Sequence, residues 1–142
     1  MTTDKMPKDE LVALLNVLLE AERAGARAVT TLSKQAGDSA SADALREIAV
    51  DEGRFCVMLR EHILRLKGQP SSKTGDFHDK LMALETFDAK LDLLDRGQSW
   101  VVRKIAGVLP RLDDAALAAD LRDMLDVHEV NIARAAALNS AS

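Results

Sequence analysis

Four polar side chains lie at the centre of apolar helical stripes. They are therefore expected to be buried, where they could bind a ligand or share a proton away from water. At 100° per residue, Glu22, Glu52, Gln98 and His128 each fall among leucine, isoleucine and valine positions. Burying charge is costly unless it is paired or bound to a metal. Arginine and lysine face away from these stripes, so His128 is the only inward basic group. The sequence therefore predicts a shared proton, a bound divalent cation or solvent in this layer.

The depth of these residues predicts that they meet at one level. Glu22 and Glu52 lie at similar distances from the turn near residue 38. Gln98 and His128 are roughly matched about a second turn near residue 111, and Asp95 is matched more closely but faces the flank of its stripe. At about 1.5 Å of rise per residue, the mismatches amount to a few ångströms.

Long helices position this layer. Four segments with helical periodicity are separated by short breaks rich in Gly, Pro, Ser and Asp. They are predicted at residues 8–35, 41–67, 77–108 and 113–138. Helices of this length are stable only when their apolar stripes pack together. The expected fold is an all-α, antiparallel four-helix bundle, formed by a single domain over residues 1–142.

Capping residues mark the predicted helix boundaries. Ser41 is the expected N-cap of the second helix, and Asp113 or Asp114 that of the fourth. Gly68 suits the C′ position of the second helix, with Pro70 just beyond it.

The topology has two alternatives. A helix of 27 residues, the length predicted for 41–67, is about 40 Å long. The nine-residue break GQPSSKTGD reaches about 30 Å at most. A crossover along the whole bundle would therefore need unwound residues at Leu66, at Lys67 or after Phe77. Up-down-up-down order is the alternative.

At these residues the chain resembles the ferritin-like superfamily, in which two glutamates and two Glu-x-x-His motifs hold two metal ions. Glu22 matches the first-helix glutamate, and Glu52 and His128 match members of the two motifs. The phrases LLEAERAG, DEGRFC, RGQSWVVRKI and HEVNI also resemble uncharacterised bacterial ferritin-like domains. The resemblance implies a ferritin-like bundle with a metal site.

The chain departs from the pattern of that superfamily at several ligand positions. Phe55 stands three residues after Glu52, where a histidine belongs, and Leu125 stands three before His128, where a glutamate belongs. In the third helix Gln98 takes the carboxylate position, with Asp95 as a poorer-facing substitute. We therefore expect one Fe, Mn or Zn ion with a redox-related role, held by Glu22, Glu52 and His128, with Gln98 and Asp95 as weaker ligands.

Two alternatives to that metal site remain open. The layer can be a hydrogen-bonded remnant that binds no metal. In that case the protein would be a structural or interaction module that kept the bundle and lost the chemistry. The layer can also orient an amine or another cationic ligand in a small-molecule site.

Composition excludes several other functions. A net charge of −4, with 19 basic and 23 acidic residues and 3% aromatics, argues against nucleic acid binding. No apolar run approaches the length of a membrane span. A single cysteine and the absence of an apolar leader favour the cytoplasm.

Several residues outside the layer are expected to have structural roles rather than to bind a ligand. Cys56 is expected as a small core residue, and His62 and His78 as partly exposed side chains. Trp100 lies off its stripe. Together with an acidic line that includes Asp92 on the same helix, it predicts a homodimer contact.

Overall fold

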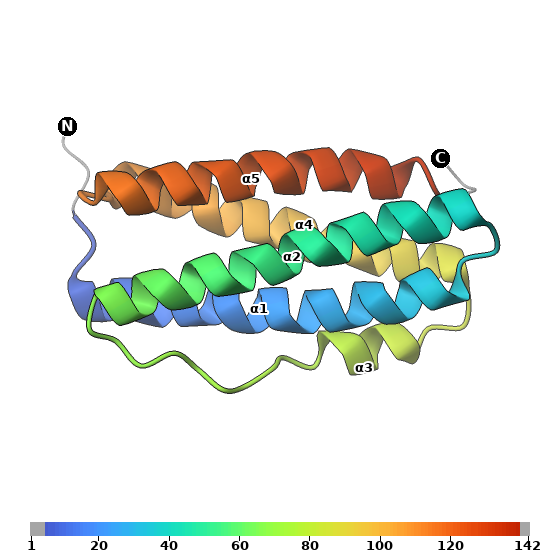
Figure 1. Cartoon of the computed structure of the whole chain (residues 1–142), viewed down its shortest axis with the longest axis horizontal. Helices are drawn as coiled ribbons and strands as arrows, with labels where there is room; N and C mark the ends of the chain where they lie inside the picture. Colours follow the sequence, from blue (N-terminus) through green and yellow to red (C-terminus); the bar gives the residue numbers. More distant parts are fainter. Residues whose placement is uncertain (1–4, 140–142) are drawn as a thin grey trace.

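The computed structural model describes residues 5–139, and it confirms the all-α class. The elements are α1 (Lys8–Gln35), α2 (Ser39–Arg65), α3 (Phe77–Met82), α4 (Phe87–Val108), the short 3₁₀ helix η1 (Leu109–Arg111) and α5 (Ala115–Ala136). The four long helices pack as two antiparallel hairpins, α1 with α2 and α4 with α5 (Figure 1). Within the described range, no helix combines the length and the apolar character needed to cross a bilayer.

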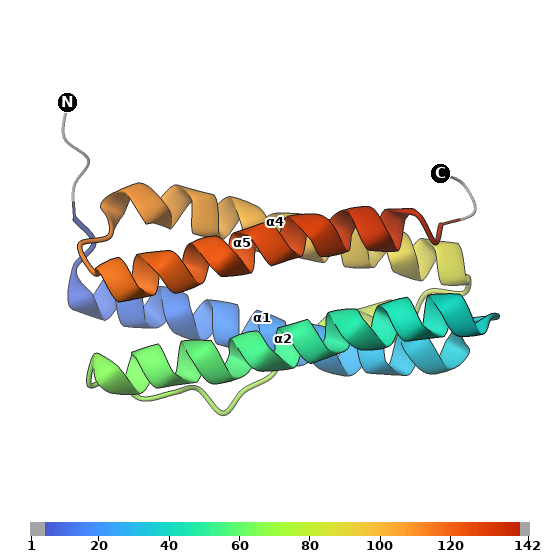
Figure 2. The same ribbon diagram turned by 45° about the horizontal axis from the view of Figure 1, so that its top comes forward.

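The structure decides the topology in favour of the crossover. Figure 1 shows α2 and α4 running in the same direction, so the chain returns along the whole bundle between them. This return uses residues 66–86, including α3, which packs against α1. The predicted nine-residue break is too short for this path. The connection is long enough because it also includes residues 77–86, which were predicted as the start of the third helix. Figure 2 shows the two hairpins stacked on each other.

The third helix predicted over 77–108 is wrong as one continuous element. It is divided into α3 and α4 by residues 83–86, and Leu84, predicted in its apolar stripe, lies in the break. Thr86 caps α4, because its side chain accepts a hydrogen bond of 3.0 Å from the backbone N–H of Ala89. Its position just before Phe87 is the signal of a helix start.

The second helix begins two residues earlier than predicted, at Ser39. Its N-cap is Asp38, whose carboxylate accepts a hydrogen bond of 2.7 Å from the backbone N–H of Ser41. For the last long helix, the alternative of Asp114 is confirmed, since its carboxylate accepts from the backbone N–H of Leu117 at 3.1 Å.

The end of α2 corrects the expected role of Gly68. Lys67, rather than the glycine, takes the left-handed C′ conformation, with φ of 65°. The backbone N–H of Gly68 donates to the carbonyl of Ile63 at 2.8 Å, which completes a Schellman turn. A Cβ at Gly68 would lie 2.6 Å from Cγ1 of Val12, so the glycine is needed for close packing on α1.

Two apolar clusters fill the bundle, one towards each end. The first contains Leu15 and Leu19 of α1 with Phe55 of α2, and the second contains Val29 of α1 with Ile48 of α2. The four polar residues of the predicted layer lie between these clusters on their helices. The hydrophobic core is therefore interrupted at mid-height by a level of polar side chains.

Candidate functional site

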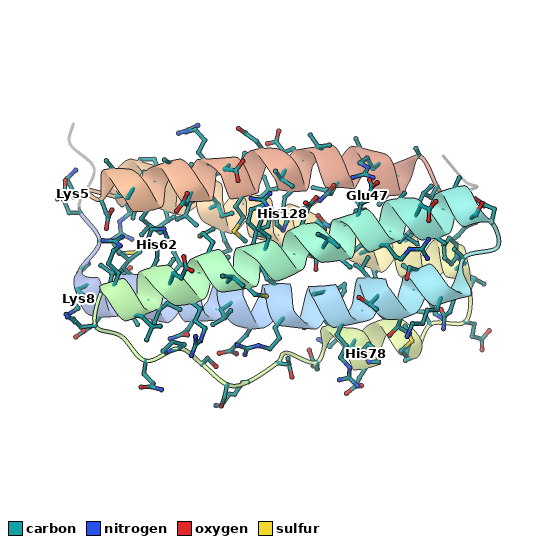
Figure 3. All side chains as sticks on the ribbon, viewed as in Figure 1. Lys5, Lys8, Glu47, His62, His78 and His128 are labelled. Carbon is teal, nitrogen blue, oxygen red and sulfur yellow. The ribbon has the colours of Figure 1, made fainter. Side chains whose placement is uncertain are left out.

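The layer of polar residues is deeply buried. Glu22, Glu52, Gln98 and His128 are 2%, 3%, 4% and 1% exposed. They come one each from α1, α2, α4 and α5. Figure 3 shows His128 near the middle of the bundle's length. Polar groups at this depth need partners, because an unsatisfied buried group costs about 1–3 kcal/mol.

His128 and Glu22 form the first pair of the layer. The Nε2 atom of His128 lies 2.9 Å from Oε1 and 3.2 Å from Oε2 of Glu22. The Nδ1 atom of His128 lies 2.8 Å from the carbonyl oxygen of Met124, to which it donates. Burial opposes a charge on the imidazole, but the hydrogen bond and the negative charge of Glu22 outweigh it, and the pKa of His128 is raised. The charged form of the imidazole is therefore favoured beside this carboxyl group.

Glu52 and Gln98 form the second pair. The Nε2 of Gln98 donates to Oε1 of Glu52 at 3.2 Å. Burial, and then the negative charges of Glu22 and Asp51, raise the pKa of Glu52 well above its ordinary value. A proton retained on Glu52 would remove the excess negative charge that the sequence implied, which is one of the three outcomes that the sequence leaves open.

Two buried oxygens of the layer, Oε2 of Glu52 and Oε1 of Gln98, accept no hydrogen bond. Oε1 of Glu22 accepts none either, but it is in ionic contact with His128, 2.9 Å from Nε2. The imidazole N–H of His128 is directed at the other oxygen of Glu22. Glu22, Glu52 and Gln98 all line one cavity of about 390 Å³, so the unpartnered oxygens belong to residues that a ligand could reach.

The lining of the cavity also includes residues that solvent reaches. Among these, Phe77 and Trp100 are half-buried and Lys80 is exposed. The volume of the cavity lies at the lower end of the range of about 300–1,000 Å³ that is typical of small-molecule sites. Trp100, expected as a surface or dimer contact, therefore lines the cavity, and the ammonium group of Lys104 lies 5.5 Å from the centre of its ring.

Two glycines shape this cavity. A Cβ at Gly25 would overlap Oε2 of Glu52 and lie 3.1 Å from its Cδ, so only glycine leaves room for this carboxyl group. A Cβ at Gly97 would lie 2.9 Å from Cε1 of Phe77, so the glycine lets the Phe77 ring lie directly on α4. The packing of Gly25 against Glu52 depends on the approach of α1 to α2 and cannot be read from the sequence of either helix alone.

The residues present do not fit a two-metal centre. Phe55 occupies one motif position with a buried ring, whose centre lies 5.5 Å from that of His128. Leu125 occupies the other and packs on the apolar cluster. Asp95, the weaker candidate, is exposed. Within residues 5–139, no three histidine, cysteine, aspartate or glutamate side chains gather in an arrangement suited to a metal ion.

Asn131 and Asp51 form a polar contact near the layer that the sequence analysis did not predict. Asn131 is 2% exposed and donates from Nδ2 to Oδ2 of Asp51 at 3.1 Å. It lies one turn after His128 on α5, which is the signal that could have identified it.

His62 was expected to be partly exposed, and this is wrong. It is buried, and its Nε2 lies 2.6 Å from Oδ2 of Asp120. Arg65 donates from Nη2 to Nδ1 of His62 at 2.8 Å and to Oδ2 of Asp114 at 2.6 Å. These contacts tie α2 to α5 and its cap at a distance from the layer along the bundle, as Figure 3 shows for His62 and His128. His78 is half-buried, as expected.

Comparison with known proteins identifies the family but assigns no activity. No curated protein and no solved structure was found to match the chain significantly. One family model matches residues 9–137, which include the four long helices except the first residue of α1. The chain belongs to the family described as Domain of unknown function (DUF6306).

Proposed function

We propose that the protein is a binding module for a small organic cation, which it holds in the cavity between α1, α3 and α4. The observation that carries this proposal is that Oε2 of Glu52 and Oε1 of Gln98 are buried and unpartnered, and that both residues line the same cavity as Glu22. A primary ammonium group has three N–H donors and no acceptor, as a lysine side chain has. It therefore offers a donor for each of these two oxygens.

The charge of the layer supports a cationic ligand. Glu22 and His128 balance each other as an ion pair, and Glu52 is neutral in the free protein because its pKa is raised. When a cation enters, Glu52 can release its proton and become the counter-ion. The net charge of the layer then stays the same in the free and bound states, so no uncompensated charge is buried.

The bundle's connectivity supports the ferritin-like resemblance, because ferritin-like folds also use one long crossover. The proposed module thus keeps this scaffold and uses its polar layer differently. A single Fe, Mn or Zn ion held by Glu22, Glu52 and His128 remains a prediction, as does the homodimer. The amine is favoured because the residues present form a cavity with unpartnered acceptors rather than a compact set of metal ligands.

Isothermal titration calorimetry tests the proposed function. The probes are n-butylammonium and butane-1,4-diammonium, with 1-butanol as a neutral compound of similar shape. We expect at least one of the two ammonium ions to bind with one-to-one stoichiometry, and butanol to bind at least tenfold more weakly. Glu52→Gln should weaken ammonium binding at least tenfold, because the counter-ion is lost.

Glu61→Gln is the matched control, because Glu61 is an exposed glutamate of the same helix. It should change the dissociation constant by less than twofold. The proposal is wrong if neither ammonium ion binds, if butanol binds equally well, or if Glu52→Gln has no effect. Stoichiometric binding of Fe, Mn or Zn that requires Glu22 and His128, without ammonium binding, would favour the metal site instead.

A further inference from the structure

We infer that the ligand is a primary monoamine with a compact apolar body, and that Phe77 and Gly97 set the space available to this body. This inference rests on the proposed function and adds the chemical class of the ligand. It follows from the polar and apolar side chains that line the cavity together.

The buried part of the cavity is lined by polar and apolar side chains together. Beside Glu52 and Gln98, Leu94 and Val101 are buried and Ala21 is half-buried. Burying apolar surface is favourable by about 25 cal/mol per Å². The part of a ligand next to its ammonium group therefore gains affinity by being hydrocarbon and loses affinity by being charged.

Among the described residues that line the cavity, the exposed carboxylate already has a cationic partner. Asp76 and Lys80 both line the cavity, and Nζ of Lys80 lies 3.4 Å from Oδ2 of Asp76. The carboxylate of Asp76 is thus already paired, and Lys80 adds a positive charge beside it. A diamine long enough to reach these exposed residues would meet this ammonium group, so the site disfavours it.

Phe77 and Gly97, which we call the rim, form a close contact between α3 and α4 in the wall of the cavity. Phe77 is the first residue of α3, and its ring rests on Gly97 of α4, where a Cβ would lie 2.9 Å from Cε1 and 3.3 Å from Cζ. Both residues line the cavity. A methyl group at position 97 must displace the ring and change the cavity beside it, while Glu22, Glu52 and Gln98 keep their places.

The test compares amines that differ only in the body that they carry. In calorimetric titrations at constant pH, affinity should rise about fourfold for each methylene added from methylammonium to n-butylammonium. n-Butylammonium should bind at least tenfold more tightly than butane-1,4-diammonium. Butyltrimethylammonium, which has no N–H donors, should bind at least tenfold more weakly than n-butylammonium.

Gly97→Ala tests the role of the rim. It should weaken n-butylammonium binding at least fivefold and change methylammonium binding by less than twofold. Gly107→Ala is the matched control, because Gly107 is on the same helix and its Cβ would meet no atom within 4 Å. It should leave both affinities unchanged, and circular dichroism checks that both variants keep their helical content.

The outcomes separate this inference from the proposed function. Equal or tighter binding of the diammonium ion, or no gain with chain length, would overturn the monoamine inference while the cation site stands. Equal losses for methylammonium and n-butylammonium in Gly97→Ala would overturn the role of the rim. Failure of every ammonium ion to bind would overturn the proposed function itself.

Discussion

The imidazole of His128 and the carboxylate of Glu22 are in contact across the bundle, with Nε2 2.9 Å from Oε1, and both residues are almost completely buried. Glu52, the second glutamate of the layer, has an amide rather than a cation as its hydrogen-bonded neighbour. The two glutamates therefore have opposite environments at the same level, and their substitution should have opposite effects.

Replacing each glutamate by glutamine should change stability in opposite directions. Glu22→Gln should lower the free energy of unfolding by about 1–2 kcal/mol near pH 7, because His128 loses its anionic partner. Glu52→Gln should raise it by about 1 kcal/mol, because glutamine needs no proton to be neutral. Urea unfolding measures both, with exposed Glu61→Gln expected within about 0.5 kcal/mol of the parent. Destabilisation by Glu52→Gln would contradict this account.

Stability should fall as pH rises within a window from 4.5, the ordinary pKa of Glu52, to 9.0, the ordinary pKa of Cys56. Glu52 has a pKa above its ordinary 4.5, so the folded state binds more protons than the unfolded state and loses stability as pH rises. His128 has a pKa above its ordinary 6.5, so its contribution is complete below 6.5 and is lost as pH rises through the folded value.

The other groups with shifted pKa values do not reverse the fall of stability with rising pH. Asp38 and Asp114 have pKa values below their ordinary 3.8, so they act only in more acidic solution. The pKa of Cys56 is about 11, above the window. Urea midpoints across the window measure the profile, and Glu52→Gln should flatten it. A stability that rises with pH would refute the assigned protonation states.

Gly25→Ala should abolish ligand binding by moving the Glu52 carboxyl group. The added methyl group overlaps Oε2 of Glu52, which must turn away from the cavity. We expect n-butylammonium affinity to fall at least tenfold and the free energy of unfolding to fall by about 1–3 kcal/mol. Gly53→Ala is the control on α2, where a Cβ meets nothing within 4 Å. It should gain about 0.5–1 kcal/mol from helix propensity. Equal behaviour of the two variants would disprove the packing argument.

Cys56 should react slowly with alkylating reagents in the folded protein. Burial, and then the negative charge of Glu22, raises the pKa of its thiol to about 11. Because the thiolate is the reactive form, its reaction with iodoacetamide near pH 8 should be about a hundredfold slower than in the unfolded chain. Mass spectrometry of the labelled protein, with and without urea, measures both rates. Rapid labelling of the folded chain would show that the thiol is not held in this environment.

Helical periodicity predicted α1 at its observed bounds and identified the four residues of the polar layer. These features are local, because a stripe of leucines and a polar residue within it can be read from one helix at a time. The break between α3 and α4 was missed because Leu84 continued the periodicity of its neighbours. The cap at Thr86, supported by the reach that the crossover requires, decided against the longer helix.

The sequence by itself determined that four amphipathic helices form, and that each places one polar side chain in its apolar face. Only the tertiary structure decided that α2 and α4 run parallel, that Glu22 takes His128 as its partner, and that Glu52 faces a cavity beside Gly25. The physical reason is that a helical stripe depends on neighbours three and four residues apart. Pairing, burial and protonation instead depend on groups brought together from distant parts of the chain.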